Sequence, residues 1–199
     1  MKKQLGTLIL STALALTFTA CSGKDAKPDT QPGAEEENFR CRIDSQLAPE
    51  WACGNATIDG SITAVGSAPL SKLGQGFSRR EALANGRSNL AQQIQTLVKD
   101  QVTTFARSTG VADGEVADKV STQVSNQSAK ASLRGSKQVK FWQNPGNNDI
   151  YVLVGLDESI MNGEIKKQVK SSFKNDDALW QQFQAKNALE ELEKQFPTD

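Results

Sequence analysis

The fold is decided by residues 78–110, SRREALANGRSNLAQQIQTLVKDQVTTFARSTG, a helical pattern that no proline interrupts. Apolar side chains recur along it at helical spacing, at Leu83, Leu90, Ile94, Leu97, Val98, Val102 and Phe105. Ser78 and Glu81 have the spacing of a capping box, so we expect one helix of about 30 residues from Ser78 to near Gly110. Small residues allow it to pack closely against a sheet, namely Ala82, Gly86 and Ala91.

Strands are predicted on both sides of this helix. Residues 61–68, SITAVGSA, alternate in polarity and end at a proline, as a short strand does. Residues 134–142 lead through the turn at 144–148 into the run DIYVLVGLD, and two such runs around an Asn/Pro/Gly turn indicate a hairpin. Residues 150–154 are apolar at nearly every position, which predicts a central strand with both faces covered.

Further helices are expected after the long one. Asp113 is a plausible N-cap for a second helix, whose stripe of Val116, Val120 and Val124 is narrow and covers little core. Beyond residue 157, one helix carries Ile160, Ile165, Val169 and Phe173. Asp176 or Asp177 can cap a last helix with apolar residues at Leu179, Trp180, Phe183, Leu189, Leu192 and Phe196. That terminal helix must dock on its own domain or on a partner.

The first 20 residues read as a secretory signal. Met1–Lys3 is positively charged, residues 5–18 are uncharged and mostly apolar, and small residues precede Cys21. The tetrapeptide at 18–21, FTAC, resembles a lipobox with Phe where an aliphatic residue is usual. We therefore expect cleavage before Cys21 and a covalent lipid on it, with no other cofactor. The alternative is an ordinary signal peptide with an incidental cysteine.

Residues 22–38 are expected to form a disordered tether, because they hold prolines and an acidic run but no large apolar side chain. Ser22 stands where an inner-membrane retention signal usually places Asp. By resemblance to lipoprotein sorting, this favours the periplasmic side of the outer membrane, with surface display left open.

Cys41 and Cys53 are the thiols that remain once Cys21 is acylated. In an oxidising compartment an even pair usually forms a disulfide, here closing a loop of about 13 residues and contributing about 3 kcal/mol. A reactive or metal-binding pair is the rival interpretation, but the spacing fits neither a CxxC motif nor a zinc site.

Composition excludes several classes of function. Removing Lys2 and Lys3 with the signal leaves 21 basic against 23 acidic residues, a net charge of −2. The mature chain therefore has no excess of positive charge for binding nucleic acid, and its sequence shows no polybasic patch for anionic lipid. The chain has no histidine, which removes Ser-His and Cys-His nucleophile pairs and the commonest metal ligand. A carboxylate pair is the one enzymatic route left, and we expect neither an enzyme nor a metal site; Asp113, Glu115 and Asp118 lack the spacing of a calcium loop.

Two weaker signals point to binding. Gly74 and Gly76 precede a helix start with Arg79 and Arg80 close by, a pattern that could hold an anion, although a lone GxG is a weak signal and a plain glycine turn explains it better. Trp51, Trp142 and Trp180 are either interface anchors or core residues. Trp180, with Phe183, is the best candidate for contact with a partner.

Several ordered elements together resemble the Lpp-twenty family of small bacterial membrane-associated lipoproteins. They are Pro49-x-Trp51, Val65-Gly66-x-Ala68, Glu81-Ala82, Gly86–Ile94, Trp142 and Tyr151–Val154, within residues 45–157. The resemblance implies an α+β domain with a long amphipathic helix on a small antiparallel sheet of about three strands. Some similar lipoproteins belong to the flagellar outer-membrane ring or disc.

These observations predict a signal peptide at 1–20, a lipidated tether at 21–38, the α+β domain at 39–157 and a helical extension at 158–199. We expect a non-enzymatic structural or assembly lipoprotein, with protein partners or a homo-oligomer. The alternative is a periplasmic binding module for peptidoglycan, lipid or an anion.

Overall fold

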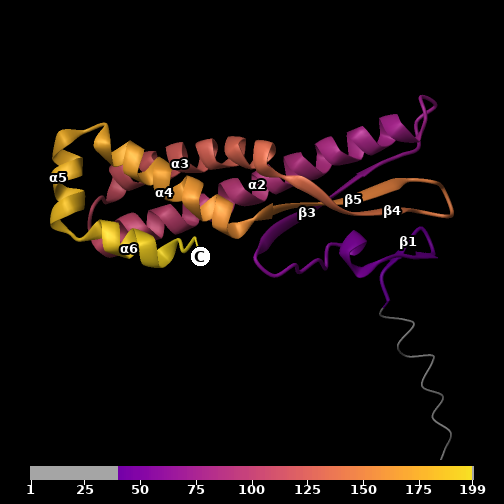
Figure 1. The fold of residues 1–199 in the computed structure, drawn as a ribbon, viewed down its shortest axis with the longest axis horizontal. Helices are drawn as coiled ribbons and strands as arrows, with labels where there is room; N and C mark the ends of the chain where they lie inside the picture. The colour runs from indigo at the N-terminus through magenta and orange to yellow at the C-terminus, as the bar shows by residue number, and fades with distance from the viewer. Residues whose placement is uncertain (1–39, 199) are drawn as a thin grey trace, which may run out of the picture.

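The computed structural model describes residues 40–198. The predicted signal peptide, the lipidation site Cys21 and the tether lie outside the described residues. Figure 1 shows an elongated domain with a sheet at one end, a group of helices at the other, and helix α2 running along both. The α+β class predicted from the sequence is confirmed. Within residues 40–198, no helix combines the length and apolar character needed to cross a bilayer.

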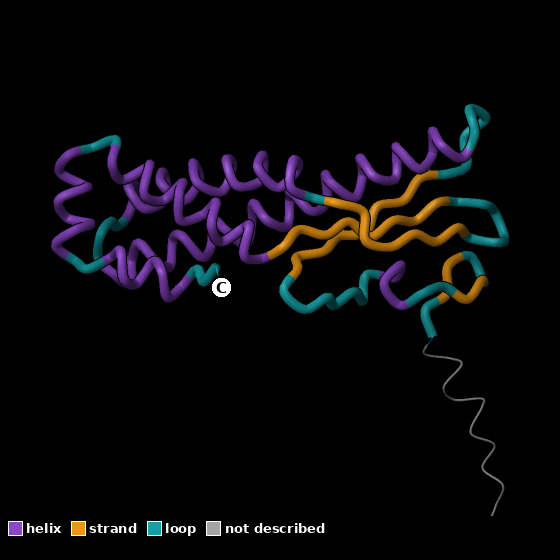
Figure 2. The backbone as a smooth tube through the Cα atoms, viewed as in Figure 1, coloured by secondary structure: helices purple, strands orange, loops and turns teal. Residues whose placement is uncertain are grey.

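The sheet has three antiparallel strands in the order β3-β5-β4. They span Ser61–Ala68 (β3), Lys137–Gln143 (β4) and Ile150–Asp157 (β5), and the β4–β5 ladder has an irregularity between Gln138 and Lys140. Strand β5 is central and nearly every residue along it is buried, as its continuous apolar run predicted. Both faces of the sheet are therefore covered (Figure 2).

Helix α2, Gln75–Thr109, covers one face of the sheet. It ends as predicted, with Gly110 in the left-handed conformation at its C-cap. The predicted capping box is wrong, because the helix begins at Gln75 and Ser78 lies inside it. The hydroxyl of Ser78 accepts a hydrogen bond from the amide of Ser71, at 2.7 Å, and so fixes the preceding turn instead of the helix end.

Strand β3 and helix α2 make backbone contact. A Cβ on Gly66 would overlap Ala82 and Gly86 of the helix, and one on Gly86 would lie 2.7 Å from Val154 Cγ2. Two asparagines of α2 complete this contact by donating to carbonyls of β3: Asn89 Nδ2 to Val65 at 2.8 Å and Asn85 Nδ2 to Ser67 at 2.9 Å. Two carbonyls of the edge strand β3 are thus satisfied by side chains of its own helix.

The other face of the sheet is covered by the segment that precedes β3. It contains the short hairpin β1–β2 (Arg42–Ile43 and Gln46–Leu47) and the 3-10 turn η1 (Glu50–Cys53). Cys41 and Cys53 form a disulfide, with S–S 2.06 Å and Cα–Cα 6.0 Å. Trp51 is 7 % exposed and packs with Leu153 of β5, forming a second, smaller core.

Four helices fill the other end of the molecule. They are α3 (Gly114–Gly135), α4 (Glu158–Lys174), α5 (Asp177–Ala185) and α6 (Ala188–Gln195). Asp113 is the N-cap residue of α3, although its side chain makes no capping bond. Val120 and Val124 are buried and Val116 is exposed, so the valine stripe is as narrow as predicted. Serines complete the buried face: Ser121, Ser125, Ser128 and Ser132.

The last helix of the sequence prediction is two helices. Asp176 caps α5 by accepting from the amide of Leu179 at 3.0 Å, as predicted, but the chain breaks at Asn187, which has φ 52°. The break folds α6 back onto the domain, where Leu192 and Phe196 are buried. Of the two alternatives for this tail, the structure has the one in which it docks on its own chain.

Candidate functional site

The four residues predicted to hold an anion lie together at the start of α2. Gly74 is the N-cap with φ 94°, Gly76 lies in the first turn, and both arginines are exposed. Arg79 Nε donates to Gln138 Oε1 of β4 at 3.0 Å. Its guanidinium lies 5.4 Å from the centre of the Phe141 ring, and that of Arg80 lies 5.8 Å from the ring of Phe77. The two arginines are therefore held over aromatic rings and do not converge on the glycine turn.

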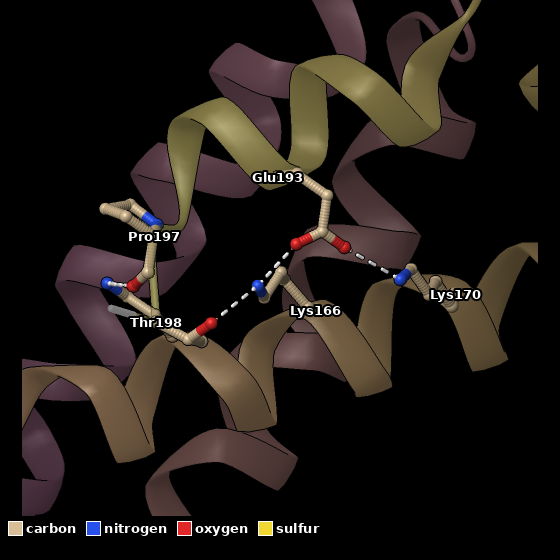
Figure 3. Close-up of polar contacts among 6 residues, drawn as sticks. Lys166, Lys170, Glu193, Pro197 and Thr198 are labelled. Atoms are coloured by element: carbon tan, nitrogen blue, oxygen red, sulfur yellow. Dashed lines mark hydrogen bonds and ion pairs between the residues drawn. The ribbon is translucent and has the colours of Figure 1, made fainter.

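A second basic surface lies on α4, and the sequence interpretation missed it. Figure 3 shows Lys166 and Lys170 pointing at the carboxylate of Glu193 on α6. Lys166 Nζ pairs with Glu193 Oε2 and also contacts Thr198 Oγ1 at 3.2 Å, while Lys170 Nζ lies 3.0 Å from Oε1. The cleft has a volume of about 640 Å³, and Lys167 and Lys174 also line it.

This lysine cleft carries an excess of positive charge. Among the described residues that line it, four are lysines and one, Glu193, carries a carboxylate; hydrogen bonds from Lys166 and Lys170 lower the pKa of Glu193 below its ordinary value of 4.5. Lys166 is the most enclosed of the ion-paired lysines, with its side chain 12 % exposed. Lys174 lies 5.0 Å above the ring of Trp180. Chemically, the cleft suits an anionic group. The sequence signal was the i, i+4, i+8 spacing of lysines 166, 170 and 174 on one helix face.

The two residues predicted to contact a partner differ in their exposure to solvent. Phe183 is fully buried, with ring centres 4.9 Å from Phe173 and 6.2 Å from Phe105, so the prediction for Phe183 is corrected: it belongs to the core of its own chain. Trp180 is partly exposed and stacks on Phe183 at 5.3 Å. Trp51 is a core residue, and Trp142 packs against Tyr151 at 5.2 Å.

The shifted pKa values of Asp157 and Tyr151 are explained by contacts that belong to the fold. The pKa of Asp157 is lowered by hydrogen bonds from the Ser159 side chain and amide at the start of α4. The pKa of Tyr151 is raised by burial and by the charges of Asp149 and Asp44. Among residues 40–198, no three Cys, Asp or Glu side chains gather in a way that could hold a metal ion.

A long helix on a three-stranded antiparallel sheet, with a disulfide-bonded segment on the opposite face, defines a small α+β domain of the kind the sequence resemblance implied. The chain belongs to the LPP20 lipoprotein family, whose family model matches residues 49–157, more than half of the chain. This match confirms the resemblance to the Lpp-twenty family and indicates a lipoprotein of the cell envelope. No curated protein matches the chain. Helices α4 to α6 lie beyond the matched residues.

Proposed function

We propose that the chain is a non-enzymatic structural lipoprotein, held to the periplasmic side of the outer membrane by lipid on Cys21. In this proposal the domain assembles with copies of itself or with other envelope proteins. The observation that carries it is the disulfide-bonded segment at the start of the domain, where the predicted tether joins the fold.

The physical argument concerns how force on the tether reaches the core. Cys41 comes three residues after the predicted tether at 22–38, and its bond to Cys53 closes the segment covalently. Trp51, inside that loop, packs on Leu153 of the central strand, which is paired on both sides. A pull at the anchored end therefore acts on a cross-linked loop and a buried strand, because the two-residue strands of β1–β2 need not bear it alone. This arrangement suits a component that holds a fixed position in an assembly.

The specific assembly we propose is the outer-membrane ring of the flagellar motor. The test compares swimming and motor images of a strain lacking the gene with strains that carry the wild-type gene, Cys21→Ala, or Cys41→Ser with Cys53→Ser. We expect loss of swimming and of the ring, restored by the wild-type gene and not by Cys21→Ala. The double serine variant should restore the ring only in part.

Normal swimming with intact motors would remove the flagellar role. Crosslinking in native membranes then tests the broader proposal, since a structural lipoprotein must crosslink to itself or to a defined partner. A chain that stays monomeric and uncrosslinked in its native membrane would overturn it.

The lysine cleft favours a second candidate function, a binding module for an anionic envelope ligand. Calorimetry with peptidoglycan fragments and with inorganic phosphate tests it. Binding should weaken at least tenfold in Lys167→Gln with Lys170→Gln, while Lys130→Gln, an exposed lysine on α3, should bind as wild type. No heat change with either ligand would remove this candidate.

A further inference from the structure

The turn between β3 and α2, residues 69–74, presents two leucines to solvent. Leu73 is 74 % exposed, more than any other large apolar side chain in residues 40–198, and Leu70 is 44 % exposed. The turn lies at the sheet end of the molecule, between the end of β3 and the start of α2 (Figure 1). Two exposed leucines within four residues form a small apolar surface, which can mark a contact with a membrane or a partner.

Three hydrogen bonds hold this turn in one conformation. The amide of Ser71 donates to Ser78 Oγ at 2.7 Å, and Ser71 Oγ accepts from the amide of Leu73 at 3.1 Å. The amide of Gly74 donates to the carbonyl of Ser71 at 3.0 Å, and Gly74 itself has φ 94°. The leucines are thus held outward by a fixed backbone.

Cations flank the leucines in the sequence. Lys72, Arg79 and Arg80 are exposed, with the guanidinium of Arg79 held over Phe141 of β4, and the sequence has no acidic residue between Asp59 and Glu81. Arg80 lies over the ring of Phe77, which places a positive charge directly beside apolar surface. The acidic residues of the β1–β2 and β4–β5 turns, Asp44 and Asp149, both accept hydrogen bonds from Asn147 Nδ2, at 2.9 Å and 3.0 Å.

Exposed leucines with cations close by in the sequence have the chemistry of a surface that meets an anionic bilayer. Apolar side chains enter the boundary between headgroups and acyl chains, while lysine and arginine contact lipid phosphates. An acidic protein surface would also complement these cations, and the predicted lipid on Cys21 favours the bilayer over it, because the anchor keeps the domain beside anionic lipid.

The position of the turn allows this contact. In Figure 1 the turn and the start of β1 both lie in the sheet half of the molecule, on opposite sides of the sheet, and the predicted tether joins the domain just before β1. The tether predicted at 22–38 has 17 residues, and a flexible linker of that length spans about 20–25 Å, which would keep the domain close to the membrane that holds the lipid. Such tethering gives a high effective concentration, so two leucines and three cations suffice although they would bind weakly alone.

We propose that residues 69–74 dock the domain on the anionic bilayer surface, with Leu70 and Leu73 inserted and Lys72, Arg79 and Arg80 on lipid phosphates. This inference rests on the lipid anchor of the proposed function and adds an orientation to it. The domain then stands on its sheet end, and helices α3 to α6 point away from the membrane.

The test places a fluorophore on Leu73→Cys in the mature lipidated chain. The disulfide and the acylated Cys21 leave the introduced cysteine as the one free thiol. The control carries the same label on Leu189→Cys, which is 39 % exposed on α6 at the other end of the molecule. Both proteins are reconstituted in vesicles of phosphatidylethanolamine and phosphatidylglycerol, and quenching by nitroxide-labelled acyl chains is measured.

We expect quenching at position 73 to exceed that at position 189 at least fivefold. It should fall severalfold in vesicles without phosphatidylglycerol, and equally when Lys72, Arg79 and Arg80 are changed to glutamine. Equal quenching at the two positions overturns the proposal, as does a crosslink from position 73 to a protein without quenching by lipid. Flotation of the chain with the vesicles reports the lipid anchor separately, so loss of the anchor is distinguished from failure to dock.

Discussion

Two glycines, Gly66 of β3 and Gly86 of α2, set the distance between the long helix and the sheet. In Gly66→Ala the added methyl group would overlap Ala82 and Gly86, so the helix must move away from the strand. We expect a loss of about 3 kcal/mol in the free energy of unfolding. Gly76→Ala is the matched control in the same helix, because nothing lies within 4 Å of its Cβ position; it should change stability by less than about 1 kcal/mol, toward greater stability. Urea denaturation measures both, and equal midpoints would contradict the close approach.

Glu193 couples the stability of the helical end to pH. Its pKa is lowered by Lys166 and Lys170, so the ionised carboxylate stabilises the folded state above its ordinary pKa of 4.5. That contribution is lost as the pH falls through the lowered pKa of the folded state. Glu193→Gln should therefore lower stability at pH 7 by at most about 1 kcal/mol, since the carboxylate is half exposed and screened by solvent.

Thermal unfolding between pH 7 and pH 3 measures this dependence. The difference between wild type and Glu193→Gln should shrink as the pH drops below 4.5 and vanish once the carboxylate is protonated. Glu190→Gln is the control, because Glu190 pairs only with the exposed Lys194 at the surface of α6. A difference that stays constant with pH would show that the ion pairs do not carry the effect.

For single residues, the sequence predicted where helices begin and end better than it predicted which groups their side chains contact. The left-handed Gly110 and the cap at Asp176 follow from local chemistry that spacing reveals. The hydroxyl of Ser78 could not be assigned, because a serine bonds equally well to its own helix end and to a preceding turn. Phe183 was expected at an interface, since nothing in its neighbours shows that Phe105 and Phe173 enclose it.

The disulfide-bonded segment is the element most open to a direct test. In Cys41→Ser with Cys53→Ser the unfolded chain regains the freedom of a loop of about 13 residues, so stability should fall by about 3 kcal/mol. Trp51 should become more exposed, because the segment that places it on Leu153 is no longer closed. Thermal melts and the wavelength of tryptophan emission measure the two effects. Unchanged emission from the folded variant would show that packing alone holds the segment.

Some helices and strands could be predicted from their own sequence and others could not. Strand β5 was predictable, because a run that is apolar on both faces has few other places in a small sheet. The buried serines of α3 were not, since serine is usually exposed, and here its small volume suits a helix packed against both α2 and α4. The break at Asn187 also escaped prediction, because an asparagine at positive φ leaves no periodicity signal.

At the scale of the whole molecule, one large core crosses the end of the family match at residue 157. It joins α2, β3 and β5 to residues of the C-terminal helices: Met161, Ile165, Val169, Phe173, Phe183, Ala188, Leu192 and Phe196. The sequence suggested a domain ending at 157 with a helical extension, since the resemblance stops there. Because these later residues share the core of the matched part, we expect the sheet end and the helical end to unfold together.

Leu192→Ala tests this cooperativity from the far end of the molecule. Leu192 is fully buried on α6, so its truncation should cost about 2–5 kcal/mol. In a Trp180→Phe background, fluorescence of Trp51 and Trp142 reports the sheet end, while far-ultraviolet circular dichroism reports mainly the helices. If the core is one unit, both signals shift to the same lower urea midpoint, although neither tryptophan lies near α6. Leu189→Ala, at a half-exposed position three residues earlier, should leave both midpoints within about 0.5 kcal/mol of wild type. A fluorescence midpoint that stays at its wild-type value while the helical signal shifts would separate the C-terminal helices from the sheet as an independent unit.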